Sequence, residues 1–342
     1  MRLVILFGGR SAEHDVSCVS ATHVAAAADP GRYEVVPVGI TIDGRWVEAV
    51  PGVGGLRDAG DEVDPSEVLA DADVVFPLLH GPLGEDGTVQ GLLELAGVPY
   101  VGAGVLGSAL CMDKAMAKQV VGCAGLPQVR HVALRDTEVD DDALARAAED
   151  LKFPLFVKPA NLGSSVGVSR AVDAGELAAA VELALTYDEW LVIEEEAVAA
   201  REIECGLLGF PHLRASAPGE VRPSHPFYDY DDKYTDGAAE VLAPAPLPCP
   251  VTQEVRRLAV EAGRALRVDG MARVDFLYEE GGRGLLVNEV NTIPGFTPIS
   301  MYSKVWEASG VSYPQLVDEL VDAGIARHRH RSRRIGRVGR PA

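Results

Sequence analysis

The chain has 342 residues, of which 47% are hydrophobic and 24% charged, and this composition excludes a wholly disordered or collagen-like chain. Its formal net charge of −20 disfavours nucleic acid and anionic membranes as partners. The 5 cysteines form no metal-like spacing and no apolar run reaches transmembrane length, so we expect a cytoplasmic protein without a disulfide framework.

Residues 1–105 alternate between apolar runs and helical patterns, which is typical of an open parallel α/β layer. Within this region, Asp43-Gly44 predicts a tight hairpin. The expected strands are 3–7, 33–40, 73–79 and 98–101, and the expected helices are 17–28 and 87–96. We therefore expect residues 1–105 to form an N-terminal substrate domain.

Residues 106–196 form a second expected region, in which a Gly/Ser-rich loop follows a strand. The loop 161–167 separates the predicted strand 153–158 from the extended run 166–171. The other elements expected here are helices 113–124 and 174–185 and strand 190–194.

Residues 197–325 are richer in strands and form the third expected region. The expected elements are the paired strands 270–279 and 284–291 and the helices 253–266 and 313–323. The Pro-, Asp- and Tyr-rich segment 218–250 predicts a long loop, and such loops in compact domains are commonly functional. The segment 326–342 is rich in arginine and contains no acid, which predicts a disordered basic tail.

Two short motifs match enzyme signatures without their required context. Residues 102–107 match the GxGxxG dinucleotide fingerprint, but the acid expected about 20 residues further on is missing. Residues 163–167 match the GxSxG nucleophile elbow, which must run directly from a strand into a helix. We expect a tight turn at the first motif and a hairpin tip at the second.

A cluster of oxygen ligands is predicted on the two paired strands. Side chains two residues apart share a face of a strand, so Arg273 and Asp275 point one way, as do Glu289 and Asn291. Asn288 should point to the opposite face. If the two polar faces coincide, the carboxylates and the amide oxygen suit Mg²⁺ or Mn²⁺ carrying a nucleotide phosphate. A solvated sheet face with a surface ion pair is the alternative.

Four connecting segments also offer groups for a phosphorylated ligand. Lys158 and the small residues of loop 161–167 could approach phosphate oxygens, although an ordinary flexible hairpin fits as well. Glu202 follows a small apolar connection whose backbone could meet a base. Residues 8–17 and 80–87 each follow a strand at its carboxyl end, where open α/β sheets bind ligands.

Together these segments resemble the D-alanine–D-alanine ligases of the ATP-grasp superfamily. The matching segments occur in family order over residues 1–325. They are FGGRSAEHDVS, HGPLGEDGTVQG, CMDK, FVKPANLGSSVGVS, FYDYDDKY, RVDF and NEVNTIPGFT. The resemblance implies a three-domain ATP-grasp fold, α/β at the N-terminus and α+β in the nucleotide-binding part, with ATP held between the central and C-terminal subdomains.

The resemblance also implies roles for individual residues. The nucleotide would be held by Lys114, Lys158, Ser165, Glu195 and Glu202. Two Mg²⁺ or Mn²⁺ ions would be bound by Asp275, Glu289 and Asn291. Substrate binding and catalysis would involve Glu13, His80, Ser164, Lys233, Tyr234, Arg273, Gly295, Ser300 and Met301.

The implied reaction joins two D-alanines through a D-alanyl phosphate and supplies a peptidoglycan precursor. The segment 218–250 would close over the site as a lid that excludes water. Relatives that make D-alanyl-D-lactate tend to lack the tyrosine at position 234, so Tyr234 favours dipeptide formation. The expected partners are D-alanine, ATP and a second copy of the chain in a homodimer.

Other functions stay open on the sequence alone. A related D-alanine–D-amino or hydroxy acid ligase of antibiotic biosynthesis or resistance is the nearest alternative. A nicotinamide-dependent oxidoreductase and a catalytically inactive binding module are more distant ones. The sequence departs from the family pattern at Ala200, where a glycine is usual, and in the arginine-rich tail.

Overall fold

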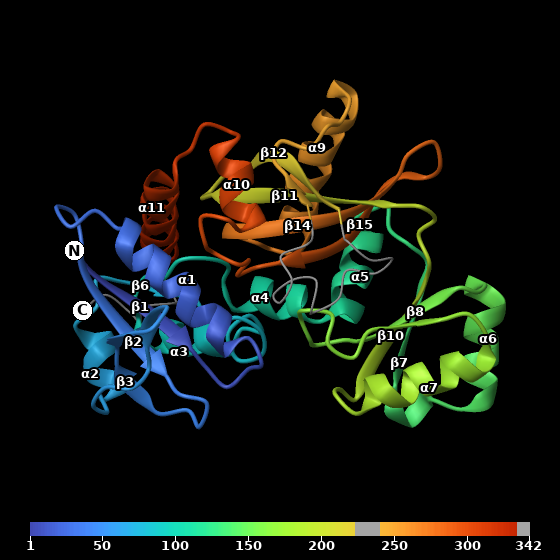
Figure 1. The fold of residues 1–342 in the computed structure, drawn as a ribbon, viewed down its shortest axis with the longest axis horizontal. Coiled ribbons are helices and arrows are strands. Elements are labelled where there is room, and N and C mark those ends of the chain that lie inside the picture. The colour runs from blue at the N-terminus through green and yellow to red at the C-terminus, as the bar shows by residue number, and fades with distance from the viewer. Residues whose placement is uncertain (223–239, 334–342) are drawn as a thin grey trace.

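The computed structural model describes residues 1–222 and 240–333. Figure 1 shows an N-terminal lobe, a central lobe and a C-terminal lobe, each built on a sheet of its own. Lys233, Tyr234 and most of the predicted lid lie outside the described residues. Among the described helices, none combines the length and the apolar character that a membrane span requires.

The N-terminal lobe contains the predicted open sheet, in the order β3-β2-β1-β6. Its elements are β1 (Arg2–Gly8), α1 (His14–Ala27), β2 (Glu34–Ile40), β3 (Trp46–Glu48), the ribbon β4 (Val50–Gly52) and β5 (Gly55–Arg57), α2 (Pro65–Ala70), β6 (Val74–Pro77) and α3 (Thr88–Ala96). β1 pairs in parallel with both β2 and β6 and is almost wholly buried, which explains its continuous apolar run. The Asp43-Gly44 hairpin joins β2 to β3 as predicted.

Two predicted elements of this lobe differ from the structure. Helix α1 begins at His14, three residues before the predicted start at residue 17. The polar residues His14 and Asp15 therefore belong to its first turn. The predicted strand 98–101 is reduced to one parallel bridge between Val75 and Tyr100.

The central lobe holds the sheet β7-β10-β8-β9, covered on one face by helices. Its elements are α4 (Val105–Met112), α5 (Lys114–Cys123), β7 (His131–Arg135), the 3-10 turn η1 (Asp136–Glu138), α6 (Asp141–Leu151), β8 (Leu155–Pro159), β9 (Ser169–Ala171), α7 (Ala174–Leu185) and β10 (Trp190–Glu195). The strands β8 and β9 are antiparallel, so residues 163–167 lie in a hairpin tip and not in a nucleophile elbow. Helices α4 and α5 share their apolar core with the C-terminal lobe.

The C-terminal lobe is built on the antiparallel sheet β13-β12-β11-β14-β15. Its elements are β11 (Arg201–Gly209), β12 (Arg214–Arg222), β13 (Glu240–Leu242), α9 (Cys249–Ala265), β14 (Gly270–Glu279), β15 (Gly284–Asn291), α10 (Met301–Glu307) and α11 (Tyr313–Ser332). Helix α9 packs with one set of sheet residues, including Cys205 and Val274, whereas α10 packs with Leu208 and Met271. The predicted loop 218–250 is too wide, because β12 and β13 enter it from its two ends.

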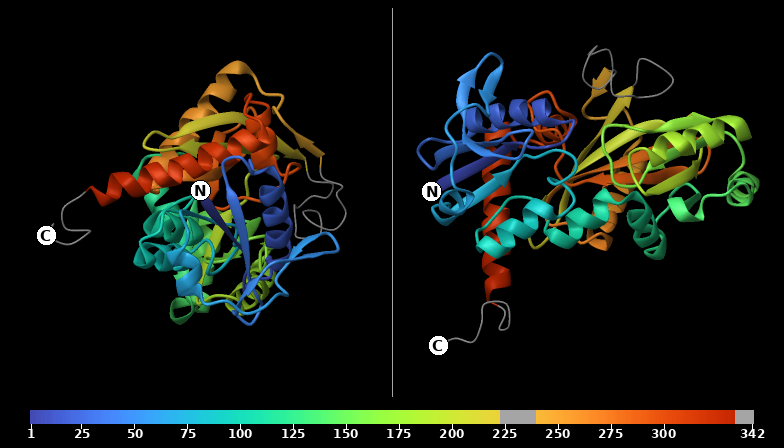
Figure 2. Two further views of the ribbon diagram at one scale, coloured as in Figure 1. Left: turned by 90° about the vertical axis from the view of Figure 1, so that its left-hand side faces the viewer. Right: turned by 90° about the horizontal axis from the view of Figure 1, so that it is seen from below.

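The last helix, α11, corrects the first part of the prediction of a disordered tail over residues 326–342, of which the structure describes residues 326–333. It runs to Ser332 and packs against α1 and β6 of the N-terminal lobe (Figure 2). Arg327 is only 3% exposed, and its guanidinium donates to the carbonyls of Gly102 and Tyr100. Arg331, one turn further, pairs with Glu94. The helical period therefore aims these two arginines at the N-terminal lobe, a placement that the charge run alone did not reveal.

We expect Arg327→Ala to lower the free energy of unfolding by about 1–3 kcal/mol, because it leaves buried carbonyl groups without a donor. Exposed Arg329 on the same helix is the matched control, and Arg329→Ala should change this free energy by less than about 0.5 kcal/mol. Urea unfolding of both variants checks this. Equal stabilities would contradict the structural role of Arg327.

Candidate active site

A cavity of about 1190 Å³ lies among the three lobes and collects polar side chains from each of them. Glu13 comes from the N-terminal lobe, Lys158 from the central lobe and Asp275 from the C-terminal lobe. The cavity wall includes every described residue that the sequence placed in the site: Glu13, His80, Lys114, Lys158, Ser164, Ser165, Glu195, Glu202, Arg273, Asp275, Glu289, Asn291, Gly295, Ser300 and Met301. The fold thus brings segments far apart in the sequence to one place.

The pairing of β14 with β15 creates the acidic wall of this cavity. Arg273 lies opposite Asn291 and Asp275 opposite Glu289, so the two polar faces coincide as predicted. The Arg273 guanidinium donates to both Asp275 carboxylate oxygens at 2.7 Å and lies 2.8 Å from Glu204. Burial lowers the pKa of Arg273, but Asp275 and Glu204 outweigh burial and raise it well above its ordinary value. Arg273 is therefore a fixed cation.

Asp275, Glu289 and Asn291 have the chemistry of a divalent-cation site. Two carboxylates and one amide oxygen share a face, and such hard oxygen ligands suit Mg²⁺ or Mn²⁺. Nearby cations balance the two carboxylates, since Arg273 pairs with Asp275 and the Lys114 ammonium lies 3.9 Å from Glu289. The donor set fits a metal–nucleotide complex.

A β-bulge adds a residue to this wall that the sequence pattern had placed elsewhere. Asp275 pairs with Glu289, but Phe276 pairs with Val287, which leaves Asn288 as the extra residue. Asn288 lines the cavity, with its side-chain oxygen 3.4 Å from the Lys158 ammonium. The prediction that Asn288 faces away was wrong, because strict alternation takes no account of a bulge.

A buried carboxylate, Glu194, holds Lys158 in place and was missed from the sequence. Its carboxylate lies 2.7 Å from the Lys158 ammonium and 2.9 Å from that of Lys118. Burial alone raises the pKa of Glu194, but the two ammonium groups outweigh burial and lower it to about 2. A carboxylate within the apolar strand β10 could have signalled a buried partner for the lysine.

The hairpin tip between β8 and β9 closes on the N-terminal lobe. Ser164 and Ser165 have φ of 50° and 58°, a left-handed conformation that is uncommon for residues other than glycine. The Ser164 hydroxyl donates to the Glu13 carboxylate, and a Cβ added to Gly163 would lie 3.3 Å from the same group. The loop thus brings its backbone against Glu13 across the cavity.

A second missed carboxylate, Glu85, joins the N-terminal loop to the C-terminal one. Its oxygens accept from the N–H of Gly81 at 2.9 Å and from that of Ile293 at 3.2 Å. Burial, and then the nearby charge of Glu13, raise the pKa of Glu85 to about 8. Buried His80 lies beside it, and its Nδ1 is 2.9 Å from the Ile293 carbonyl. Glu85 stood within a quoted sequence motif, but nothing in the spacing singled it out.

Glu195 is held differently from what its predicted role implies. Its carboxylate accepts from the backbone N–H and the guanidinium of Arg130, and it also pairs with Arg283. The segment that follows lines the cavity, and the Val198 N–H donates to Glu279 at 2.7 Å. The Glu195 carboxylate thus fixes the linker between two lobes, and the residues after it line the cavity.

Residues 102–107, the GxGxxG segment, are not among the described residues that line the cavity. The Gly102 carbonyl accepts from Arg327, and a Cβ on Gly107 would lie 2.7 Å from the Arg267 carbonyl. Residues 105–107 belong to α4, so the second half of the motif is helical and the expected tight turn is limited to the bend before Val105. Other groups of the protein thus occupy the space that a bound dinucleotide would need.

We expect Glu194→Gln to lower the free energy of unfolding by about 3 kcal/mol, since two buried ammonium groups lose their counter-charge. The double variant Glu194→Gln with Lys118→Met should recover part of this loss, because one of those charges is removed. Denaturant unfolding of both variants checks this.

The ion pairs of Glu194 also make the free energy of unfolding depend on pH. Since the folded-state pKa of Glu194 lies below its ordinary value of 4.5, its contribution should be complete above pH 4.5 and vanish as the pH falls towards 2. The stability difference between wild type and Glu194→Gln should narrow over that range. A difference that does not change with pH would contradict the assignment.

Comparisons with known proteins agree on one family. The family described as D-ala D-ala ligase N-terminus matches residues 2–103, and that described as D-ala D-ala ligase C-terminus matches residues 120–322. The D-alanine--D-alanine ligase of Thermoanaerobacter sp. (strain X514) is 46% identical over 354 residues, covering 97% of this chain and 98% of that protein. That of Solibacter usitatus (strain Ellin6076) is 48% identical over 332 residues, covering 97% of each.

Solved structures give the same result. The D-alanine-D-alanine ligase from Coxiella burnetii superposes with a TM-score of 0.83 at 34% identity, covering 97% of this chain and 96% of that one. The VanG D-Ala:D-Ser ligase from Enterococcus faecalis gives 0.81 at 33% identity, covering 94% and 99%. With its ATP-grasp architecture and full-length relatives, the chain belongs to the D-alanine–D-alanine ligase family.

Proposed function

We propose that this protein joins two D-alanines into D-alanyl-D-alanine, with conversion of ATP to ADP and phosphate, to supply a peptidoglycan precursor. The observation that carries the proposal is a cavity in which residues of all three lobes meet. The near full-length similarity to D-alanine--D-alanine ligases supports the substrate. The cytoplasmic location and the homodimeric assembly stay predictions.

The nucleotide end of the cavity lies between the β8–β9 hairpin and the β14–β15 pair. Lys158, fixed by Glu194, and Lys114 place positive charge where phosphate oxygens would lie, and Ser165 contributes from the hairpin tip. Asp275, Glu289 and Asn291 would hold two Mg²⁺ or Mn²⁺ ions. These ions would neutralise charge on the phosphates during transfer.

In the first step, a carboxylate oxygen of one D-alanine displaces ADP from the γ-phosphorus and forms an acyl phosphate. Glu13, already hydrogen-bonded to Ser164, would receive the ammonium group of that D-alanine, with His80 nearby. This contact orients the carboxylate toward the nucleotide end. The family resemblance implies that Lys233 would meet the transferring phosphate and that Tyr234 would lie at the first substrate; both residues lie outside the described residues.

In the second step, the amine of the second D-alanine, as the free base, attacks the acyl carbon and phosphate leaves. Arg273 and the backbone N–H of Gly295 would stabilise the tetrahedral oxyanion. Ser300, whose hydroxyl lies 2.8 Å from that of Thr297, and Met301 would lie at the carboxylate of the second substrate. The part of the predicted lid between β12 and β13, which lies outside the described residues, would keep water from the acyl phosphate.

A ligase with a different acceptor is the second candidate. The similarity to the VanG D-Ala:D-Ser ligase favours it, because that structure superposes with a TM-score of 0.81, close to the 0.83 of the D-alanine-D-alanine ligase from Coxiella burnetii. Release of ADP with D-alanine alone, or with D-alanine plus D-serine or D-lactate, separates the two functions. If ADP were released only when D-alanine was supplied together with D-serine or D-lactate, the proposed use of two D-alanines would be wrong.

We expect Glu289→Gln to lower kcat by more than about 100-fold, because outer-shell changes alone cost metal sites 10–100-fold and this residue would be a direct ligand. The exposed Glu149 on α6 supplies the control variant Glu149→Gln, which should keep full activity. ADP release measures both. Full activity of Glu289→Gln with its fold retained would remove the metal assignment.

We expect D-alanine to be preferred over D-lactate as the acceptor at pH 7, because Tyr234 is present. Competition between the two acceptors, followed by product analysis, measures the preference. Comparable incorporation of D-lactate and D-alanine at pH 7 would contradict this prediction.

A further inference from the structure

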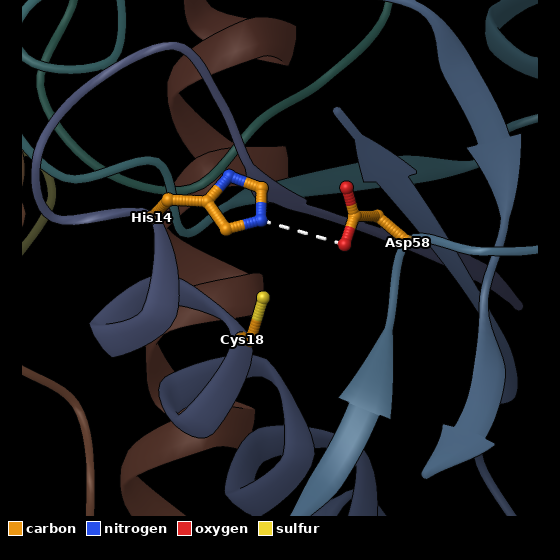
Figure 3. A group of neighbouring side chains, drawn as sticks. All are labelled: His14, Cys18 and Asp58. Carbon is orange, nitrogen blue, oxygen red and sulfur yellow. Dashed lines mark hydrogen bonds and ion pairs between the residues drawn. The ribbon is translucent and has the colours of Figure 1, made fainter. Parts of the chain in front are cut away.

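Three side chains with metal-ligating atoms meet on the side of α1 that faces the β4–β5 ribbon. They are His14 and Cys18 of α1 and Asp58, which follows β5 (Figure 3). One ligand atom of each lies within 4.8 Å of those of the other two. None of the three lines the active-site cavity, although their neighbours Glu13 and Asp15 do.

Local structure explains why these residues converge. His14 and Cys18 are four residues apart on α1, so they share one face of the helix. Asp58 reaches them because Gly39 of β2 has no side chain: a Cβ there would lie 2.5 Å from the Asp58 Cβ. In Figure 3 the Cys18 sulfur points toward the space between the His14 ring and the Asp58 carboxylate.

The hydrogen bonds of His14 orient its second nitrogen as in a metal site. Nδ1 lies 2.7 Å from the Gly9 carbonyl, which can only accept, so Nδ1 carries a proton. Nε2 faces Asp58 Oδ1 3.4 Å away, with a lone pair when the ring is neutral and with a second N–H when the ring is protonated. In the neutral ring two acceptors face each other, and a cation between them would satisfy both. A backbone carbonyl that fixes the far nitrogen is also the usual outer partner of a metal-bound histidine.

We propose that His14 Nε2, Cys18 Sγ and the Asp58 carboxylate bind one Zn²⁺ ion, apart from the site of ATP. Nitrogen, thiolate and carboxylate are the ligands that zinc takes, and bonds of about 2.0–2.3 Å place neighbouring ligand atoms at separations like that between Nε2 and Oδ1. Three protein ligands leave a fourth position for water. Mg²⁺, which prefers oxygen ligands, does not suit this set.

The surroundings make the site selective. His14 and Cys18 are buried, whereas the Asp58 side chain is 19% exposed and offers the route from solvent. Of the three ligand atoms, the Cys18 sulfur is the one that binds Zn²⁺ well and Mg²⁺ poorly. The bound ion would tie the β4–β5 ribbon to the start of α1, next to Glu13.

The test uses the full chain, freed of metal and held in excess Mg²⁺ so that the oxygen ligands of the ATP site are saturated. Co²⁺ serves as the probe, because a cobalt–thiolate bond gives a charge-transfer absorption in the near ultraviolet. We expect one Co²⁺ per chain to produce this band and one Zn²⁺ to remove it. Absence of the band would overturn the proposal and leave His14 and Asp58 as a protonated ion pair.

Variants locate the site. Cys18→Ser should abolish the band, and Asp58→Asn should weaken Co²⁺ binding by more than about 100-fold, beyond the effect of losing an outer partner. The control is the double variant Cys123→Ser with Cys249→Ser, which removes both exposed thiols and should keep the band. A band that survives Cys18→Ser, or one that the control loses, would overturn the proposal.

Thermal melting separates loss of the site from loss of the fold. Without metal, Asp58→Asn should melt as the wild type does, because the substitution keeps the size of the side chain. Added Zn²⁺ should raise the melting temperature of the wild type and leave that of Asp58→Asn unchanged. An equal rise in both proteins would contradict a role for Asp58 as a ligand.

Discussion

The register between β14 and β15 is the constraint on which the site depends. It places Asp275 opposite Glu289 and Arg273 opposite Asn291, so that acids and a fixed cation share one wall. A shift of β15 by one residue would turn Glu289 and Asn291 to the other face, which is packed with apolar side chains such as Val274 and Val290. The burial of that other face therefore specifies the register, and the core of the C-terminal lobe determines where the charges lie.

The remaining parts of the site are held in relation to this wall by buried polar contacts within the central lobe and between lobes. Glu194 fixes Lys158 near Asn288, and Glu85 accepts from a backbone N–H of the C-terminal lobe. Helix α11 closes the N-terminal sheet, and Arg327 secures it through carbonyl groups. These contacts connect elements distant in sequence, so loss of one partner leaves a buried group unsatisfied.

The sequence predicted regular elements well where one pattern dominates. The strands 270–279 and 284–291 and the helix 174–185 coincide with β14, β15 and α7. It failed where a tertiary contact decides the outcome. The bulge at Asn288 and the ion pairs of Glu194 depend on residues of other elements. The arginine-rich segment looks solvent-exposed in the sequence, because the sequence does not show that α11 packs against the N-terminal lobe. The site residues were found by family resemblance, because spacing alone left each motif ambiguous.

The central claim is that the cavity activates a D-alanine carboxylate as an acyl phosphate. Isotope transfer tests it most directly: D-alanine labelled with ¹⁸O in its carboxylate is supplied with Mg-ATP, and the released phosphate is examined by mass. Attack of a carboxylate oxygen on the γ-phosphorus predicts one ¹⁸O in each phosphate, in step with dipeptide formation. Unlabelled phosphate accompanying the dipeptide would contradict the account.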